Sequence, residues 1–77
     1  PYQALANAIV ELAVKDYKTA LKYHYRHPTK QEYEDEVASL ERFFRSGWYS
    51  QLTSVDGEYL IRRLQEEIRQ SESIRGK

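Results

Sequence analysis

Apolar residues recur at intervals of three and four along the first part of the chain, and neither Gly nor Pro interrupts residues 2–26. This spacing is typical of an amphipathic helix whose apolar stripe faces a core. The pattern therefore predicts a long first helix from Tyr2 to about Arg26. Its predicted buried stripe consists of Leu5, Ile9, Leu12, Ala13, Tyr17, Ala20, Leu21 and His24.

A second helix is predicted from about Lys30 to Arg45, because Pro28 excludes the residue before it from the helical region and ends the first helix. Thr29 and Glu32 have the spacing of a capping box at the start of the second helix. Ser46-Gly47 predicts its end, since Gly accepts the left-handed conformation there. The two helices should form an antiparallel hairpin. The apolar stripe of the second consists of Tyr33, Val37, Leu40 and Phe44.

A third helix is predicted from about Ser54 to Gln70, with Thr53 as its cap. Gly57 falls in its first turn, where Gly costs about 1 kcal/mol relative to Ala. We therefore expect Gly57 to permit close backbone approach to Trp48 or to the first helix. The candidates for burial are Val55, Tyr59, Leu60, Ile61, Leu64 and Ile68.

These elements predict an all-α fold, a small three-helix domain in which the third helix crosses the antiparallel hairpin. Residues 1–70 form the single domain, and residues 71–77 lack periodicity and are expected to fray. Between the second and third helices, Trp48 is expected to close the open end of the core. Its neighbour Tyr49 suits either the core or an interface.

Composition narrows the classes of protein that fit. The 77 residues contain no Cys, and 12 basic residues balance 12 acidic ones. A net charge of zero argues against a polyanionic nucleic-acid mimic and against a generic basic nucleic-acid binder. No apolar run approaches the roughly 20 residues of a membrane span, and no signal peptide is evident. We expect a cytoplasmic protein that does not enter a membrane.

Charge is distributed unevenly along the chain. Residues 1–31 carry five Lys or Arg against two acids, and residues 32–41 carry five acids and no base. Four of the basic residues, at spacings of three and four, form a stripe on the first helix: Lys15, Lys18, Lys22 and Arg26. This basic stripe either contacts nucleic-acid phosphates or solvates the helix and pairs with the acidic second helix, and we favour the second interpretation.

Catalytic and metal-binding patterns are weak. His24 and His27 lie three residues apart, but a stable metal site needs three or four ligands. The acid pairs Asp56/Glu58 and Glu66/Glu67 would need a concave pocket for acid–base work, which three short helices rarely build. No Ser-His-Asp, Cys-His or phosphate-loop pattern occurs in the sequence. We expect no enzyme activity, no cofactor and no metal.

Three segments together resemble a known group of proteins. They are Ala-Ile-Val…Ala-Val-Lys-Asp-Tyr-Lys-Thr-Ala-Leu within residues 8–21, Glu-Arg-Phe-Phe-Arg-Ser-Gly-Trp-Tyr at 41–49, and Leu-Thr-Ser-Val-Asp-Gly-Glu-Tyr-Leu-Ile at 52–61. This pattern resembles small uncharacterised proteins of bacterial phages and integrative elements, over about Ala4 to Ile68. The resemblance implies a context in which small accessory proteins bind host or phage macromolecules, counter-defence proteins included. It implies no activity and no site residue.

The function expected from the sequence is therefore that of a non-enzymatic, protein-binding accessory factor of a mobile element, acting on a host or defence protein. Trp48 and Tyr49 are the candidate anchors, joined by the basic stripe. Self-association is also expected, because a chain this small cannot bury all its aromatic residues. The alternative is a small nucleic-acid-binding module that uses the basic stripe.

Overall fold

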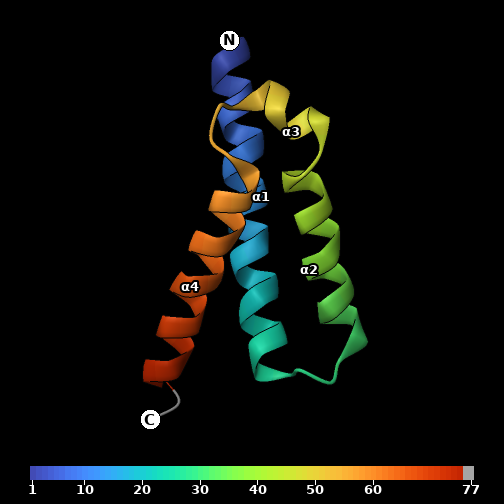
Figure 1. The fold of residues 1–77 in the computed structure, drawn as a ribbon, viewed down its shortest axis with the longest axis vertical. Coiled ribbons are helices and arrows are strands. Elements are labelled where there is room, and N and C mark those ends of the chain that lie inside the picture. The colour runs from blue at the N-terminus through green and yellow to red at the C-terminus, as the bar shows by residue number, and fades with distance from the viewer. Residues whose placement is uncertain (76–77) are drawn as a thin grey trace.

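The computed structural model describes residues 1–75, which form four helices and contain no strand. The helices are α1 (Tyr2–Arg26), α2 (Gln31–Phe44), α3 (Gly47–Leu52) and α4 (Gly57–Arg75). The predicted all-α class is confirmed. The predicted hairpin of α1 and α2 is present. A short helix, α3, stands between α2 and α4, so residues 1–75 contain four helices and not the predicted three (Figure 1).

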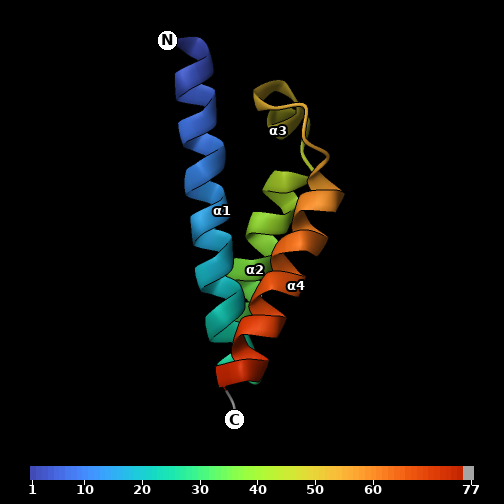
Figure 2. The ribbon, with the colours of Figure 1, turned by 90° about the vertical axis from the view of Figure 1, so that its left-hand side faces the viewer.

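The longest helix, α1, sets the layout of the molecule. In the view of Figure 1, α2 lies to the right of α1 and runs antiparallel to it, and α4 lies to the left and runs parallel to it. Both lie beside the later turns of α1, whereas only α3 lies beside its first turns. Turning the molecule shows α2, α3 and α4 all on one side of α1 (Figure 2). One side of α1, especially near its amino terminus, is therefore left without a neighbouring helix.

The core forms where the four helices meet. Tyr17 of α1 is fully buried, and its ring lies edge-on to Phe44 with the ring centroids 5.4 Å apart. Phe44 in turn lies edge-on to Tyr49 at 5.6 Å. The central cluster consists of Ala13, Tyr17, Phe44, Tyr49, Ile61 and Leu64. It joins residues from all four helices, so the short helix α3 belongs to the core.

The start of α2 differs from the predicted capping box. Lys30 is the cap residue, and its side chain makes no capping hydrogen bond. Thr29 lies one residue too early, within a turn in which the Lys30 N–H donates to the His27 carbonyl at 3.1 Å. The capping box of Thr29 and Glu32 was therefore wrong, because the turn after Pro28 extends one residue further than the sequence pattern suggests.

The Ser46-Gly47 pair starts a helix rather than only ending one. The Ser46 hydroxyl accepts a hydrogen bond from the Tyr49 N–H at 3.1 Å and donates one to the Phe43 carbonyl at 2.6 Å. One side chain thus serves the last turn of α2 and the first turn of α3. Gly47 does not adopt a positive φ. The predicted left-handed stop at Gly47 was therefore wrong.

Helix α4 begins three residues later than predicted. The Thr53 hydroxyl accepts from the Val55 N–H at 3.2 Å and shapes the preceding turn. The Asp56 carboxylate accepts from the Tyr59 N–H at 2.9 Å and acts as the cap. A Cβ added at Gly57 would lie 2.0 Å from the Phe44 carbonyl oxygen. The expected close approach is confirmed, but it involves the end of α2 and not Trp48 or α1.

Helix α4 does not end at Gln70 as predicted but continues through Arg75. Glu72 points inward, is 7% exposed, and accepts hydrogen bonds from Arg26 at 2.7 and 3.2 Å. This bidentate contact joins the last turns of α1 and α4 and supports helix where fraying was expected. The remaining part of the predicted frayed tail, residues 76–77, lies outside the described residues.

Candidate functional site

The basic stripe of α1 contacts α4 and not the acidic helix α2. The Lys18 ammonium lies 3.3 Å from the Glu67 carboxylate, and Arg26 binds Glu72. The Arg26 guanidinium holds the pKa of Glu72 below its usual range, mainly through this hydrogen bond. Lys15 and Lys22 form no ion pair within residues 1–75. Two of the four basic side chains are thus committed to holding α4 against α1, and the predicted pairing with α2 was wrong.

One acidic residue of α2, Glu41, takes part in a hydrogen-bond network that joins helices. Glu41 accepts a 2.6 Å hydrogen bond from the Tyr17 hydroxyl and lies 3.5 Å from Arg45. The Gln65 side-chain amide of α4 donates to the Tyr17 hydroxyl at 3.2 Å and to the Glu41 carboxylate at 3.3 Å. Burial, and then the Glu41 hydrogen bond, raise the pKa of Tyr17 far above the usual range of a tyrosine. This network fixes three helices together and keeps the Tyr17 hydroxyl protonated.

Trp48 and Tyr49 occupy opposite environments. Helix α3 turns Tyr49 and Leu52, three residues apart, toward the core, and Tyr49 is 2% exposed. Trp48 lies on the neighbouring side of the same helix and is 56% exposed. The expectation that Trp48 closes the core was therefore wrong, because Tyr49 takes that position. Trp48 stays available as an anchor for a partner, and Tyr49 does not.

A second group of exposed apolar residues lies on the first three turns of α1. Tyr2, Leu5 and Leu12 are 63%, 61% and 60% exposed, and Ile9 between them is half-buried. Their spacings of three, four and three place them along one side of the helix. We call these four residues the amino-terminal face. Leu5 and Leu12 were predicted to be buried, so this part of the predicted stripe was wrong.

The alanines of α1 explain why the amino-terminal face is exposed. Ala6, Ala13 and Ala20 repeat every seven residues and are all buried, so they mark the side of α1 that packs. Leu5 and Leu12 lie beside that line of alanines on the helix and are exposed. The Tyr2 hydroxyl donates to the Gln51 carbonyl of α3 at 3.3 Å. The first turn of α1 and helix α3, which carries Trp48, therefore lie at the same end of the molecule (Figure 1).

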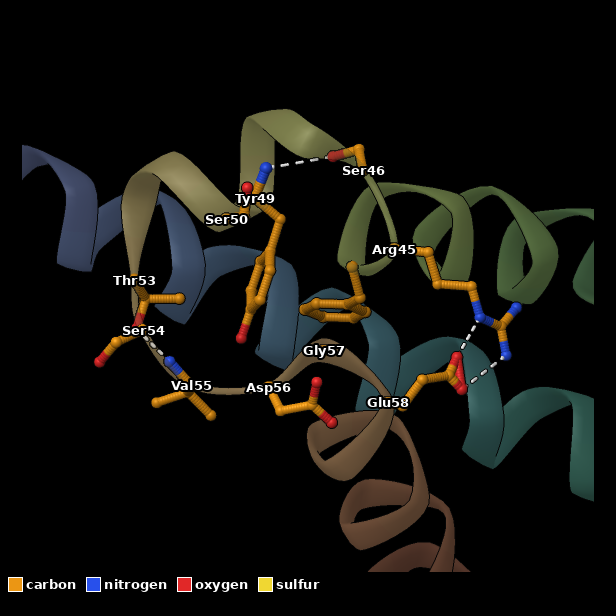
Figure 3. Close-up of a pocket in the computed structure, with 11 residues that line it drawn as sticks. Arg45, Ser46, Tyr49, Ser50, Thr53, Ser54, Val55, Asp56, Gly57 and Glu58 are labelled. Carbon is orange, nitrogen blue, oxygen red and sulfur yellow. Dashed lines mark hydrogen bonds and ion pairs between the residues drawn. The ribbon is translucent and has the colours of Figure 1, made fainter.

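A polar hollow of about 450 Å³ lies where α2, α3 and α4 meet (Figure 3). Its carboxylates are engaged, since Asp56 caps α4 and Glu58 pairs with Arg45. Among residues 1–75, the buried Tyr49 hydroxyl finds no hydrogen-bond partner. Burial and the nearby Asp56 charge raise the pKa of Tyr49, so its hydroxyl keeps its proton and cannot serve as a base. These features describe a structural junction in which both carboxylates are engaged.

Residues 1–75 contain neither a group of metal-ligating side chains nor a helix able to cross a membrane. No three His, Asp or Glu side chains in this range lie close enough to hold a metal ion. His24 is half-buried on α1, whereas His27 lies in the turn with its ring 5.8 Å from that of Tyr33. None of the four helices combines the length and the apolar character that crossing a membrane requires.

Comparisons with protein-family models, with curated proteins and with solved structures find no match to this chain. The resemblance to phage and mobile-element proteins therefore stays a prediction from the sequence. The function has to be argued from the surface and the packing described above.

Proposed function

We propose that the protein is a non-enzymatic protein-binding factor whose binding surface is the amino-terminal face together with Trp48. The observation that carries this proposal is the exposure of Tyr2, Leu5 and Leu12 on one side of α1, each at about three fifths of its full area. Trp48 adds an exposed indole at the same end of the molecule. Aromatic anchors surrounded by apolar contacts are typical of protein interfaces.

The chemistry of the face indicates the kind of partner. Residues 2–10 carry no charged side chain, and the first charge of α1 is Glu11. An apolar row on a helix with spacings of three and four accepts another amphipathic helix, which inserts side chains between those of α1. We therefore propose a helical partner segment that lies along the first three turns of α1 and contributes aliphatic side chains.

The nucleic-acid alternative draws less support. A phosphate-binding stripe needs free cationic side chains, whereas Lys18 and Arg26 are held by Glu67 and Glu72. The net charge of zero also provides no general attraction to a polyanion. The accessory role on a host or defence protein stays a hypothesis that rests on the resemblance to phage and mobile-element proteins.

Affinity capture with matched variants tests the proposal. Immobilised wild-type protein, Leu12→Glu and Ile74→Glu would be incubated with nuclease-treated host lysate, and bound proteins quantified by mass spectrometry. Ile74 is 76% exposed near the end of α4, so Ile74→Glu adds the same charge away from the face. We expect a partner that wild type and Ile74→Glu retain and Leu12→Glu loses, and that binds the purified protein directly. Retention by all three, or loss of every partner after nuclease treatment, would contradict the proposal.

A further inference from the structure

We propose that a hollow between α1 and α2 receives an arginine side chain of a partner protein. The hollow has a volume of about 350 Å³. Six residues line it: Asp16, Thr19, Ala20, Tyr23, Tyr33 and Glu36. None of them belongs to the amino-terminal face or to α3. The inference therefore goes beyond the proposed function and assigns a second, separate contact on the hairpin of α1 and α2.

Two tyrosine rings, one from each helix, line the hollow. Tyr23 and Tyr33 are stacked, with ring centroids 5.5 Å apart and ring planes inclined by 21°. Tyr23 is exposed and Tyr33 is half-buried, so ring surface remains open to a ligand. The face of a tyrosine ring attracts a cation, most strongly one that gives up its water easily. This pair of rings therefore favours an organic cation.

Both charged residues in the lining are acidic. Asp16 of α1 and Glu36 of α2 are exposed and form no ion pair within residues 1–75. The cations of α1 that are paired, Lys18 and Arg26, bind acids of α4 instead. Helix α2 contributes no basic side chain before Arg42. The hollow is therefore negative, which complements a positively charged side chain of a partner.

Arginine meets both features of the hollow at once. Its planar guanidinium stacks on aromatic rings, binds carboxylates through paired hydrogen bonds, and is more weakly hydrated than the ammonium group of lysine. Asp16 and Tyr23 lie two turns apart on one side of α1, and Tyr33 and Glu36 lie one turn apart on α2. Each helix thus supplies one carboxylate and one ring. Between them Ala20 is buried, and its short side chain leaves room for the guanidinium.

An NMR titration with a small arginine probe tests this site. N-acetylarginine N-methylamide would be added to isotopically labelled protein while the backbone amide shifts are followed. Contacts as exposed as these imply a dissociation constant on the order of millimolar, and the saturable shifts should cluster at the lining residues. N-acetylcitrulline N-methylamide has the same shape without the charge and should bind at least about fivefold more weakly. The lysine analogue, which lacks the planar group, should also bind more weakly.

Two variants and a matched control separate the hollow from the general charge of α2. Glu36→Gln removes one carboxylate and Tyr33→Leu removes one ring, and each should weaken probe binding about two- to fivefold. Glu34→Gln removes the same charge from α2, but Glu34 is exposed and does not line the hollow. This control should bind the probe like wild type. Circular dichroism checks that every variant keeps its helices.

Each remaining outcome would count against the inference. Equal weakening by Glu34→Gln and Glu36→Gln would indicate diffuse attraction to an acidic helix and would overturn it. Citrulline binding as tight as arginine binding, or no saturable shift at the lining residues at about ten times the expected dissociation constant, would overturn it as well. Equal binding of the lysine probe would contradict the assignment to a guanidinium. The proposed function is tested separately, because Leu12→Glu alters the amino-terminal face and leaves the hollow unchanged.

Discussion

Replacing Gly57 by Ala tests the packing of the junction that joins α2, α3 and α4. The new Cβ would lie 2.0 Å from the carbonyl oxygen and 3.0 Å from the carbonyl carbon of Phe44, and 3.6 Å from a ring carbon of Tyr49. The first two neighbours are backbone atoms at the end of α2, so a rotamer change cannot relieve the contact. Gly57 also has no positive φ, and the expected loss is therefore steric and not conformational.

The size of the effect follows from two opposing terms. Ala in place of Gly stabilises an exposed helical position by about 0.5–1 kcal/mol. Overpacking of a close contact costs about 1–3 kcal/mol, and a separation of 2.0 Å to backbone belongs at the upper end of that range. The net loss of about 2 kcal/mol corresponds to a fall of about 8–16 °C in the thermal midpoint for a domain of this size.

Thermal unfolding followed by circular dichroism measures this difference, and the chain contains a matched control. Gly47 begins α3, lacks a positive φ, and a Cβ added there would meet nothing within 4 Å. Gly47→Ala should therefore leave the midpoint unchanged or raise it slightly. An unchanged or raised midpoint for Gly57→Ala would refute the close packing of α4 on the end of α2.

Three further changes are expected to have distinct effects. Trp48→Ala should change the free energy of unfolding by less than about 0.5 kcal/mol in thermal melts, because its side chain is exposed and not in the core. Tyr17→Phe should lower the free energy of unfolding by about 1–2 kcal/mol in urea titrations, because the substitution removes the buried hydrogen bond to Glu41. Arg26 lowers the pKa of Glu72, so this pair stabilises the fold above the usual glutamate pKa. Its contribution is lost as the pH falls through the lowered value, and Glu72→Gln should flatten the acid side of a midpoint-against-pH profile.

Much of the fold could be predicted from the sequence, because the three long helices follow from apolar periodicity and from the break at Pro28. The ends of the helices were harder to predict. Thr53 and Asp56 are both chemically suited to cap α4, and the choice depends on the contact of Gly57 with Phe44 in three dimensions. The contact of Arg26 with Glu72 joins residues 46 positions apart, so no local pattern could have predicted it.

The candidate site was harder to predict than the fold. Leu5 and Leu12 share the apolar stripe of α1 with Ala6 and Ala13, and hydrophobicity alone favours burial of the leucines. Burial depends instead on how far the neighbouring helices reach, and α2 and α4 lie beside only the later turns of α1 (Figure 1). The seven-residue repeat of buried alanines was the available signal. Trp48 was also misplaced. Its neighbour Tyr49 fills the core position that Trp48 was expected to occupy.

Site-specific photocrosslinking in cells tests most directly whether the amino-terminal face binds protein. A photoreactive amino acid would replace Leu12 in one variant and Ile74 in another, both at positions that are well exposed. The proposal predicts covalent protein adducts from position 12 and none of comparable yield from position 74. Equal yields from the two positions, or no adduct at position 12, would contradict the assignment of this face as the binding surface.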